Sequence, residues 1–188
     1  MITIKCAVAN EQFGVSRGVC LQTVQWKFGS SPPVAALVNP RPNAKPQDEQ
    51  NIKYMKPTFR CGTRKAIDEL AEELNLPNDL TMQDWEYTAG NPHEIEKYIS
   101  HYVSTTDDDK KFVLMELIIQ ATEDQETEDL FITYWNKIKP ILEKDFKIHE
   151  YTIYYWSCFD NEDVNNCWKL TPLIRQFWLD NKVKYKQF

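Results

Sequence analysis

Apolar residues recur at intervals of three and four positions from about residue 63 onward, the spacing of an α-helix with one buried face. In the first such segment Thr63 can cap the helix start, and Pro77 stops the helix. Asn91 and Pro92 predict a second helix start, with Asn at the N-cap and Pro in the first turn. The positions predicted to face inward are Ala66, Ile67, Leu70, Ala71 and Leu74 in the first helix and Ile95, Tyr98, Ile99 and Tyr102 in the second.

A third helix is predicted to open at the acidic run 106–109 and to continue through KKFVLMELIIQA. Because this segment is apolar on nearly all sides, we expect the helix to be central and buried. Its narrow polar stripe consists of Asp109, Glu116, Gln120 and Glu123.

Two more helices are predicted toward the C-terminus, one from about Thr127 and one from Thr171. Pro140 is expected to kink or interrupt the first of them, because proline lacks the N–H that an internal helix position donates. The segment 148–158 favours a strand by composition but a helix by its position between helices, and we interpret it as a helix. The positions predicted to face inward are Leu130, Phe131, Tyr134, Trp135, Ile138 and Leu142 in the first helix and Leu173, Ile174, Phe177 and Trp178 in the second.

The N-terminal third has a different backbone chemistry, since six of the ten prolines and four of the five glycines precede residue 65. These residues exclude long helices there and leave short β-favouring runs at 2–8, 19–28 and 34–38. The predicted fold is therefore mainly α, or α+β overall. We expect an acidic antiparallel helical bundle or short helix-pair stack at 63–188, after a small β or irregular region at 1–62.

The formal net charge is -6, and the balance of basic and acidic residues changes near residue 64, close to the change in backbone chemistry. Residues 1–64 hold nine Lys or Arg against three acids, whereas residues 65–188 hold 13 against 25. The basic residues are spread along the N-terminal region without a dense cluster, which argues against nucleic-acid binding. We expect this basic region to pack against the acidic one.

The location of the chain is inferred from what its sequence lacks. No run approaches the roughly 18 to 20 apolar residues of a membrane-spanning helix, and the first residues do not have the pattern of a secretory signal. Five cysteines with irregular spacing indicate free thiols in a reducing compartment, with a Cys158–Cys167 disulfide as the less favoured alternative. We therefore expect a cytoplasmic protein with no membrane partner.

Known catalytic and metal-binding motifs were sought, and none is present. The chain has neither phosphate-binding glycine loop, and the segment at His93 is H-E-I-E-K rather than H-E-x-x-H. His101 lies seven residues after Glu94 at one helix edge, but one His and one Glu are too few ligands for zinc. The acidic loop 160–163 lacks the glycine and glutamate of a calcium loop. We expect no cofactor, no metal and no catalytic residue.

Acidic and aromatic clusters are the better candidates for function. The acids at 107–109 are explained as a helix cap, whereas five acids within seven residues at 123–129 exceed what one cap needs. Aromatic residues are dense at 151–178, where core packing accounts for most of them and a surface subset would anchor a protein. The predicted partner-binding residues are Glu123, Asp124, Glu126, Glu128, Asp129, Tyr155 and Trp156.

The segments DDDKKFVLMELIIQATED (107–124) and IHEYTIYYWSCFDNEDVNNCWKLTPLIRQFW (148–178) carry a resemblance. Over about residues 82–180 the chain resembles small, acidic, helical bacterial proteins that are encoded beside toxins as immunity proteins. The basic N-terminal region lies outside this pattern. The resemblance implies a protein that neutralises a partner by binding it.

The leading hypothesis is thus a non-enzymatic protein-binding protein, in its specific form a bacterial immunity protein that covers a basic toxin site. One alternative is a small hydrolase or transferase whose carboxylates and tyrosines are dispersed in the sequence. Another is a structural subunit of a larger assembly.

Overall fold

A computed structural model describes residues 55–79, 82 and 84–185, which all belong to one compact unit spanning residues 34–188. The predicted strands at 2–8, 19–28 and 34–38, and the rest of the basic region before residue 55, lie outside the described residues. Residues 55–63 have no regular secondary structure and lead into the first described helix. Side chains are described as far as Lys182.

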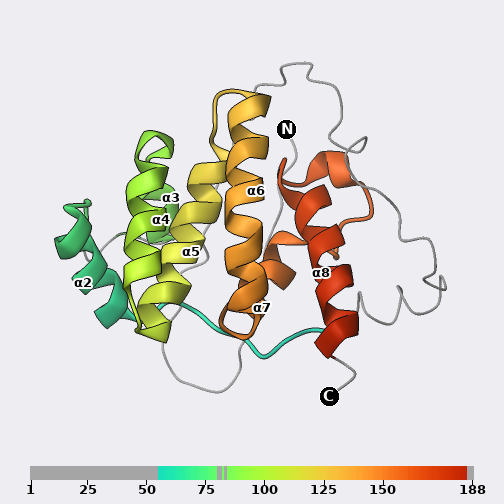
Figure 1. Ribbon diagram of the computed structural model, residues 1–188, viewed down its shortest axis with the longest axis horizontal. Coiled ribbons are helices and arrows are strands. Elements are labelled where there is room, and N and C mark those ends of the chain that lie inside the picture. The colour runs from blue at the N-terminus through green and yellow to red at the C-terminus, as the bar shows by residue number, and fades with distance from the viewer. Residues whose placement is uncertain (1–54, 80–81, 83, 186–188) are drawn as a thin grey trace. The chain divides into compact units, whose positions relative to one another are not determined.

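Helices make up most of the described chain, and no strand occurs within it, which confirms the prediction of a mainly α fold. The α-helices are α2 (Arg64–Leu74), α3 (Trp85–Ala89), α4 (Ile95–Ser104), α5 (Asp108–Glu123), α6 (Glu128–Lys144), α7 (Phe146–Trp156) and α8 (Thr171–Tyr185). Two 3-10 turns, η2 (Pro92–Glu94) and η3 (Val164–Asn166), precede α4 and α8. Figure 1 shows α4, α5 and α6 running alternately down, up and down, with α7 behind α6.

Polar side chains begin the helices where the sequence predicts them. The hydroxyl of Thr63 accepts from the backbone N–H of Ala66, the amide oxygen of Asn91 from that of His93, and the hydroxyl of Thr127 from that of Leu130. The first two contacts confirm the predicted N-caps, and the third caps the helix that was predicted to start at about Thr127. Helix α2 ends at Asn75, whose φ of 52° places it in the left-handed region, before Pro77 is reached.

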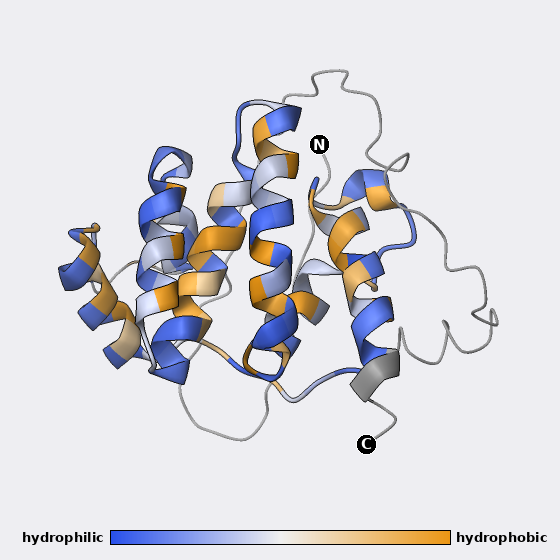
Figure 2. Cartoon of the chain, viewed as in Figure 1, coloured by the Kyte–Doolittle hydropathy of each residue, from blue (hydrophilic) through white to orange (hydrophobic). Residues whose placement is uncertain are grey.

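Helix α5 is the central element, because it packs against α2, α3, α4, α6 and α7. Residues Phe112 to Met115 and Leu117 to Thr122 are all buried, which confirms the predicted central helix. Its polar stripe differs from the prediction: Gln120 and Glu123 are also buried, because α3 and the segment before α8 cover that side. Figure 2 shows hydrophobic residues around the middle of α5 and hydrophilic ones in its connection to α6.

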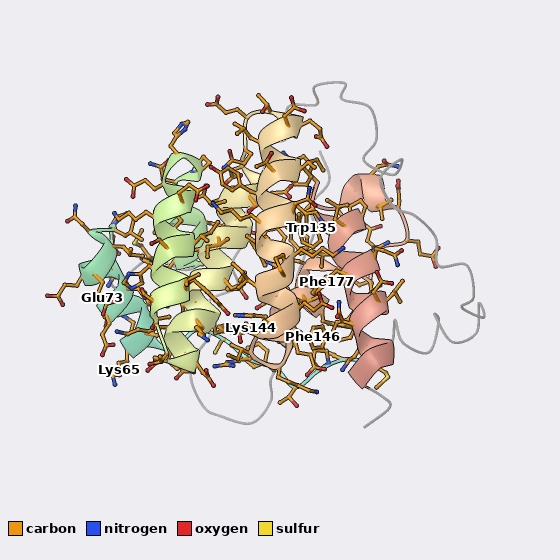
Figure 3. The ribbon with its side chains drawn as sticks, viewed as in Figure 1. Lys65, Glu73, Trp135, Lys144, Phe146 and Phe177 are labelled. Carbon is orange, nitrogen blue, oxygen red and sulfur yellow. The ribbon has the colours of Figure 1, made fainter. Side chains whose placement is uncertain are left out.

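Helices α6, α7 and α8 are joined by an aromatic cluster. The rings of Trp135 and Phe177 meet edge to face with centroids 6.0 Å apart, and Phe146 lies 6.3 Å from Phe177 (Figure 3). Helix α7 confirms the helical interpretation of residues 148–156. Pro140 does not interrupt α6, which continues to Lys144, and Leu130 is 43% exposed rather than inward, because it lies in the solvent-facing first turn. None of the helices in the described ranges combines the length and hydropathy that a bilayer crossing requires.

Candidate functional site

The acidic segment 123–129 connects α5 to α6, and its first residue has a structural role. The carboxylate of Glu123 accepts hydrogen bonds from the backbone N–H groups of Lys169 at 2.7 Å and Leu170 at 2.8 Å. Its side chain is buried, and burial raises the pKa of Glu123 while the two amide hydrogen bonds oppose that rise. Glu123 therefore fixes the approach to α8 and is not available to a partner, which corrects its prediction as a surface contact.

The other four predicted acids are exposed, and we call them the acidic junction: Asp124, Glu126, Glu128 and Asp129. Within the described chain, none of them forms a salt bridge with a lysine or arginine, and Glu126 has only His93 at 3.9 Å. Asp124 accepts a hydrogen bond from the Gln120 amide at 2.7 Å. The nearby Lys169 ammonium does not neutralise the junction; it donates to the Gln125 carbonyl and lies over the Phe131 ring.

Part of the acidic junction is explained by helix electrostatics. Glu128 and Asp129 lie in the first turn of α6, where the helix dipole favours negative charge. Asp124 and Glu126 follow the last turn of α5, where the same dipole disfavours it. The helix dipoles therefore favour the charges of only one half of the junction, Glu128 and Asp129.

The two predicted aromatic contacts differ in exposure. Tyr155 is 42% exposed, and its ring lies 6.5 Å from Tyr151 and 5.4 Å from Trp168. Trp156 is only 1% exposed and packs beneath Trp168, with centroids 4.7 Å apart, so its prediction as a surface contact is corrected. Trp168 also joins this surface to the acidic region, because the next two backbone amides bind Glu123.

A second carboxylate site, which the sequence did not indicate, lies halfway along α5. Glu116 is half-buried and accepts a hydrogen bond from the Thr152 hydroxyl of α7, with the Trp156 indole beside it. Burial raises the pKa of Glu116 to about 7, and the negative charge of Glu86 on α3 adds to the rise. Burial also raises the pKa of Glu86. The signal in the sequence was Glu116 itself, a lone acid inside an apolar run.

Aromatic side chains border this carboxylate pair. Tyr87 follows Glu86, is 39% exposed, and has its hydroxyl against the Trp168 side chain. Burial raises the pKa of Tyr87, and the charge of Glu86 raises it further, so the phenol is protonated at neutral pH. The arrangement combines two carboxyl groups of raised pKa with a phenol and an indole.

His149 lies in the first turns of α7 and belongs to a buried hydrogen-bond chain. The Tyr102 hydroxyl donates to Asp145 at 2.8 Å, and its oxygen lies 2.7 Å from His149 Nε2. Lys111 donates to the same Asp145 oxygen at 3.1 Å. Since the single Tyr102 proton is given to the carboxylate, His149 Nε2 must donate to the Tyr102 oxygen. Burial lowers the pKa of His149 to about 3, so the ring is neutral at pH 7.

The remaining histidines are at the edges of helices, as predicted. His93 is exposed in the capping turn, and His101 Nε2 lies 2.8 Å from Glu73 of α2 rather than near Glu94, which pairs with Lys97. Among the residues that the structure describes, no three His, Cys, Asp or Glu side chains are grouped so as to hold a metal ion.

Comparison with models of protein families, with curated protein sequences and with solved structures finds no match for the chain.

Proposed function

We propose that the chain is a non-enzymatic protein-binding protein whose acidic junction covers a basic surface of its partner. The observation that supports this proposal is the group of four exposed carboxylates that have no lysine or arginine partner within the described chain. Such a group attracts a positively charged surface and speeds encounter at low salt. A basic partner would supply the neutralising charges that residues 55–79, 82 and 84–182 do not.

Tyr155 and Trp168 supply the apolar part of the proposed surface. Their rings pack at a tilt of 41° beside the segment that Glu123 anchors, so they are held in place before a partner arrives. A pre-positioned aromatic pair loses little side-chain entropy on binding. Tyr155 therefore stays in the proposed contact surface, whereas Glu123 and Trp156 are left out.

More specifically, we propose that the partner is a basic toxin and that the chain is the bacterial immunity protein that neutralises it. The resemblance of residues 82–180 to immunity proteins supports this form. Co-expression with the toxin encoded beside the gene is expected to restore growth. If no adjacent product is toxic, or if growth is not restored, the immunity role is wrong while general protein binding is still testable.

The binding proposal is tested by charge reversal. Tagged wild-type chain is used to capture a partner from the cells that express it, and the affinity is then measured with the purified partner. Glu126→Lys/Glu128→Lys is expected to weaken binding at least tenfold and to flatten its salt dependence, because it removes the complementary charge. Glu72→Lys/Glu162→Lys changes the net charge equally at other exposed acids and is the matched control. A partner that is not basic, or equal loss in both variants, would refute the proposal.

A second candidate function rests on the Glu116 site. A carboxyl group with a pKa near 7 beside a second carboxyl group is suited to general acid–base catalysis, which favours the hydrolase or transferase alternative. In this reading Glu116 transfers the proton, and Tyr87 and Trp168 flank the substrate.

The test of this second function is a pH–rate profile on a panel of chromogenic ester, glycoside and phosphate substrates. A rate that changes with an inflection near pH 7, is lost in Glu116→Gln and is kept in Glu72→Gln would support it. Absence of turnover above the uncatalysed rate with the whole panel would count against it.

A further inference from the structure

Cys158 and Cys167 are brought together at the end of α7. Their Sγ atoms are 3.1 Å apart, whereas the sequence favoured separate free thiols. Cys158 follows α7 with a φ of 48°, a left-handed conformation that turns the chain sharply back. Cys167 follows η3 and immediately precedes Trp168. The loop between them therefore begins and ends at two touching sulfur atoms.

Arg175 of α8 holds both ends of this loop in place. Its guanidinium donates to the carbonyl oxygen of Ser157 at 2.6 Å, to that of Asn161 at 2.7 Å and also to that of Cys158. The same group lies 3.9 Å from the Cys167 sulfur. The loop is thus fixed by a side chain from a different helix, so the thiols are already positioned for reaction and need no large backbone movement.

We propose that Cys158 and Cys167 are a thiol–disulfide exchange site that forms a reversible intramolecular disulfide with a low-molecular-weight disulfide as oxidant. One thiol loses its proton and attacks a sulfur of the oxidant, which releases one thiolate and leaves a mixed disulfide. The second cysteine then attacks the mixed disulfide and expels the other thiolate. The two protons of the cysteines pass to the two thiolates, so the pair is oxidised and the oxidant reduced to two thiols.

The Cys158–Cys167 disulfide would also affect the proposed contact surface. It links the end of α7 to the residue before Trp168, whose ring packs on Tyr155 and Trp156. Closing the loop lowers the entropy of the unfolded chain, and the oxidised protein is expected to melt about 5 °C higher than the reduced one. Oxidation would therefore stiffen the connection that holds Trp168.

The experiment incubates the folded full-length chain with buffers of oxidised and reduced glutathione, quenches it with an alkylating agent and maps the peptides by mass spectrometry. The expected result is a Cys158–Cys167 cross-link, lighter by two hydrogens and reversed by dithiothreitol. Cys61 is exposed and serves as an internal control that should carry glutathione or alkyl groups instead.

Variants separate pairing from ordinary thiol reactivity. Cys158→Ser and Cys167→Ser should each lose the cross-link and the rise in melting temperature, and should accumulate a glutathione adduct on the remaining cysteine. Cys61→Ser should keep both properties. The proposal is overturned if wild-type Cys158 and Cys167 stay reduced in fully oxidised glutathione, carry lasting glutathione adducts or pair with other cysteines. The peptide map of the wild-type chain decides between these outcomes even if a variant fails to fold.

Discussion

Acidic residues lie around both ends of α5, but their contacts differ. At the N-terminal end, Lys110 lies 2.8 Å from Glu69 and 2.7 Å from Glu73, and Lys111 lies 3.1 Å from Asp145. Each of these acids forms an ion pair with a lysine of α5, and Glu69 and Glu73 share Lys110. These pairs join α2 and the start of α7 to the N-terminal end of the central helix.

At the C-terminal end the acids divide into one buried carboxylate and four exposed ones. Glu123 is satisfied by backbone amides, whereas the acidic junction has no lysine or arginine partner within the described residues. The difference teaches that the density of acids in a sequence does not identify a binding surface. What distinguishes the two ends is whether the fold supplies a compensating group, and the following variants test that distinction.

The largest effect is expected for Glu123→Ala. This change leaves two backbone N–H groups without acceptors in a buried place and opens a small cavity, so it should lower the free energy of unfolding by about 4 kcal/mol. Asp124→Ala is the matched control at the adjacent exposed position, with an expected change below about 0.5 kcal/mol. Urea unfolding measures both, and similar values for the two would show that the buried and exposed acids do not differ as described.

The next effect concerns Glu116, which lies between the two ends. The pKa of Glu116 is raised to about 7 in the folded chain, whereas an unfolded glutamate ionises near 4.5, so stability is lost as the pH rises through this window. Glu116→Gln keeps an acceptor for Thr152 and removes the ionisation. It should therefore raise the free energy of unfolding by about 3 kcal/mol at pH 8 and by less than about 0.5 kcal/mol at pH 4.5.

The control for this pH effect is Glu72→Gln on α2, which makes the same chemical change at an exposed position. Urea unfolding at the two pH values should give nearly equal stabilities for this variant and the wild type. An increase at pH 8 that is the same in both variants would mean that net charge, rather than burial of Glu116, is responsible.

The sequence predicted the helices well because their signals are local. Caps at Thr63, Asn91 and Thr127 and the three- and four-residue apolar spacing depend only on neighbouring residues. Helix α3 was not predicted, because five residues are too few to show a period. The charge network could not be predicted either, since Lys110 and its partners are brought together by the packing of α2 on α5.

The candidate site could be predicted only in part, for a similar reason. The acidic segment 123–129 could be recognised in the sequence. Which of its acids is buried depends on the backbone of Lys169 and Leu170, more than forty residues away. Trp156 and Tyr155 are adjacent on α7, and the packing of Trp168 decides which of them is covered. Periodicity gives the faces of a helix, whereas tertiary contacts decide which polar groups are already satisfied.

A smaller effect is expected at the paired end of α5. Lys110→Met keeps the packing of the side chain but removes the ion pairs to Glu69 and Glu73, and it should cost about 1 kcal/mol at low ionic strength. The loss should shrink in 1 M NaCl, because salt already screens these pairs in the wild type. Lys65→Met on α2 is the control. The Lys65 side chain, labelled in Figure 3, is 82% exposed and lies 3.8 Å from Glu69, so its loss should be within about 0.3 kcal/mol.

The smallest effect is expected when the two halves of the acidic junction are neutralised separately. The sign of the change in stability distinguishes the two halves. At pH 8 and low salt, Asp124→Asn/Glu126→Gln removes charge just beyond the last turn of α5 and should stabilise the chain by about 0.3 kcal/mol. Glu128→Gln/Asp129→Asn removes charge from the first turn of α6 and should destabilise it by about 0.5 kcal/mol. Both variants change the net charge equally, so chemical denaturation separates the helix dipole from general repulsion. If both were stabilising, repulsion would dominate and the whole junction would lack a structural reason, which strengthens the case that a basic partner explains it.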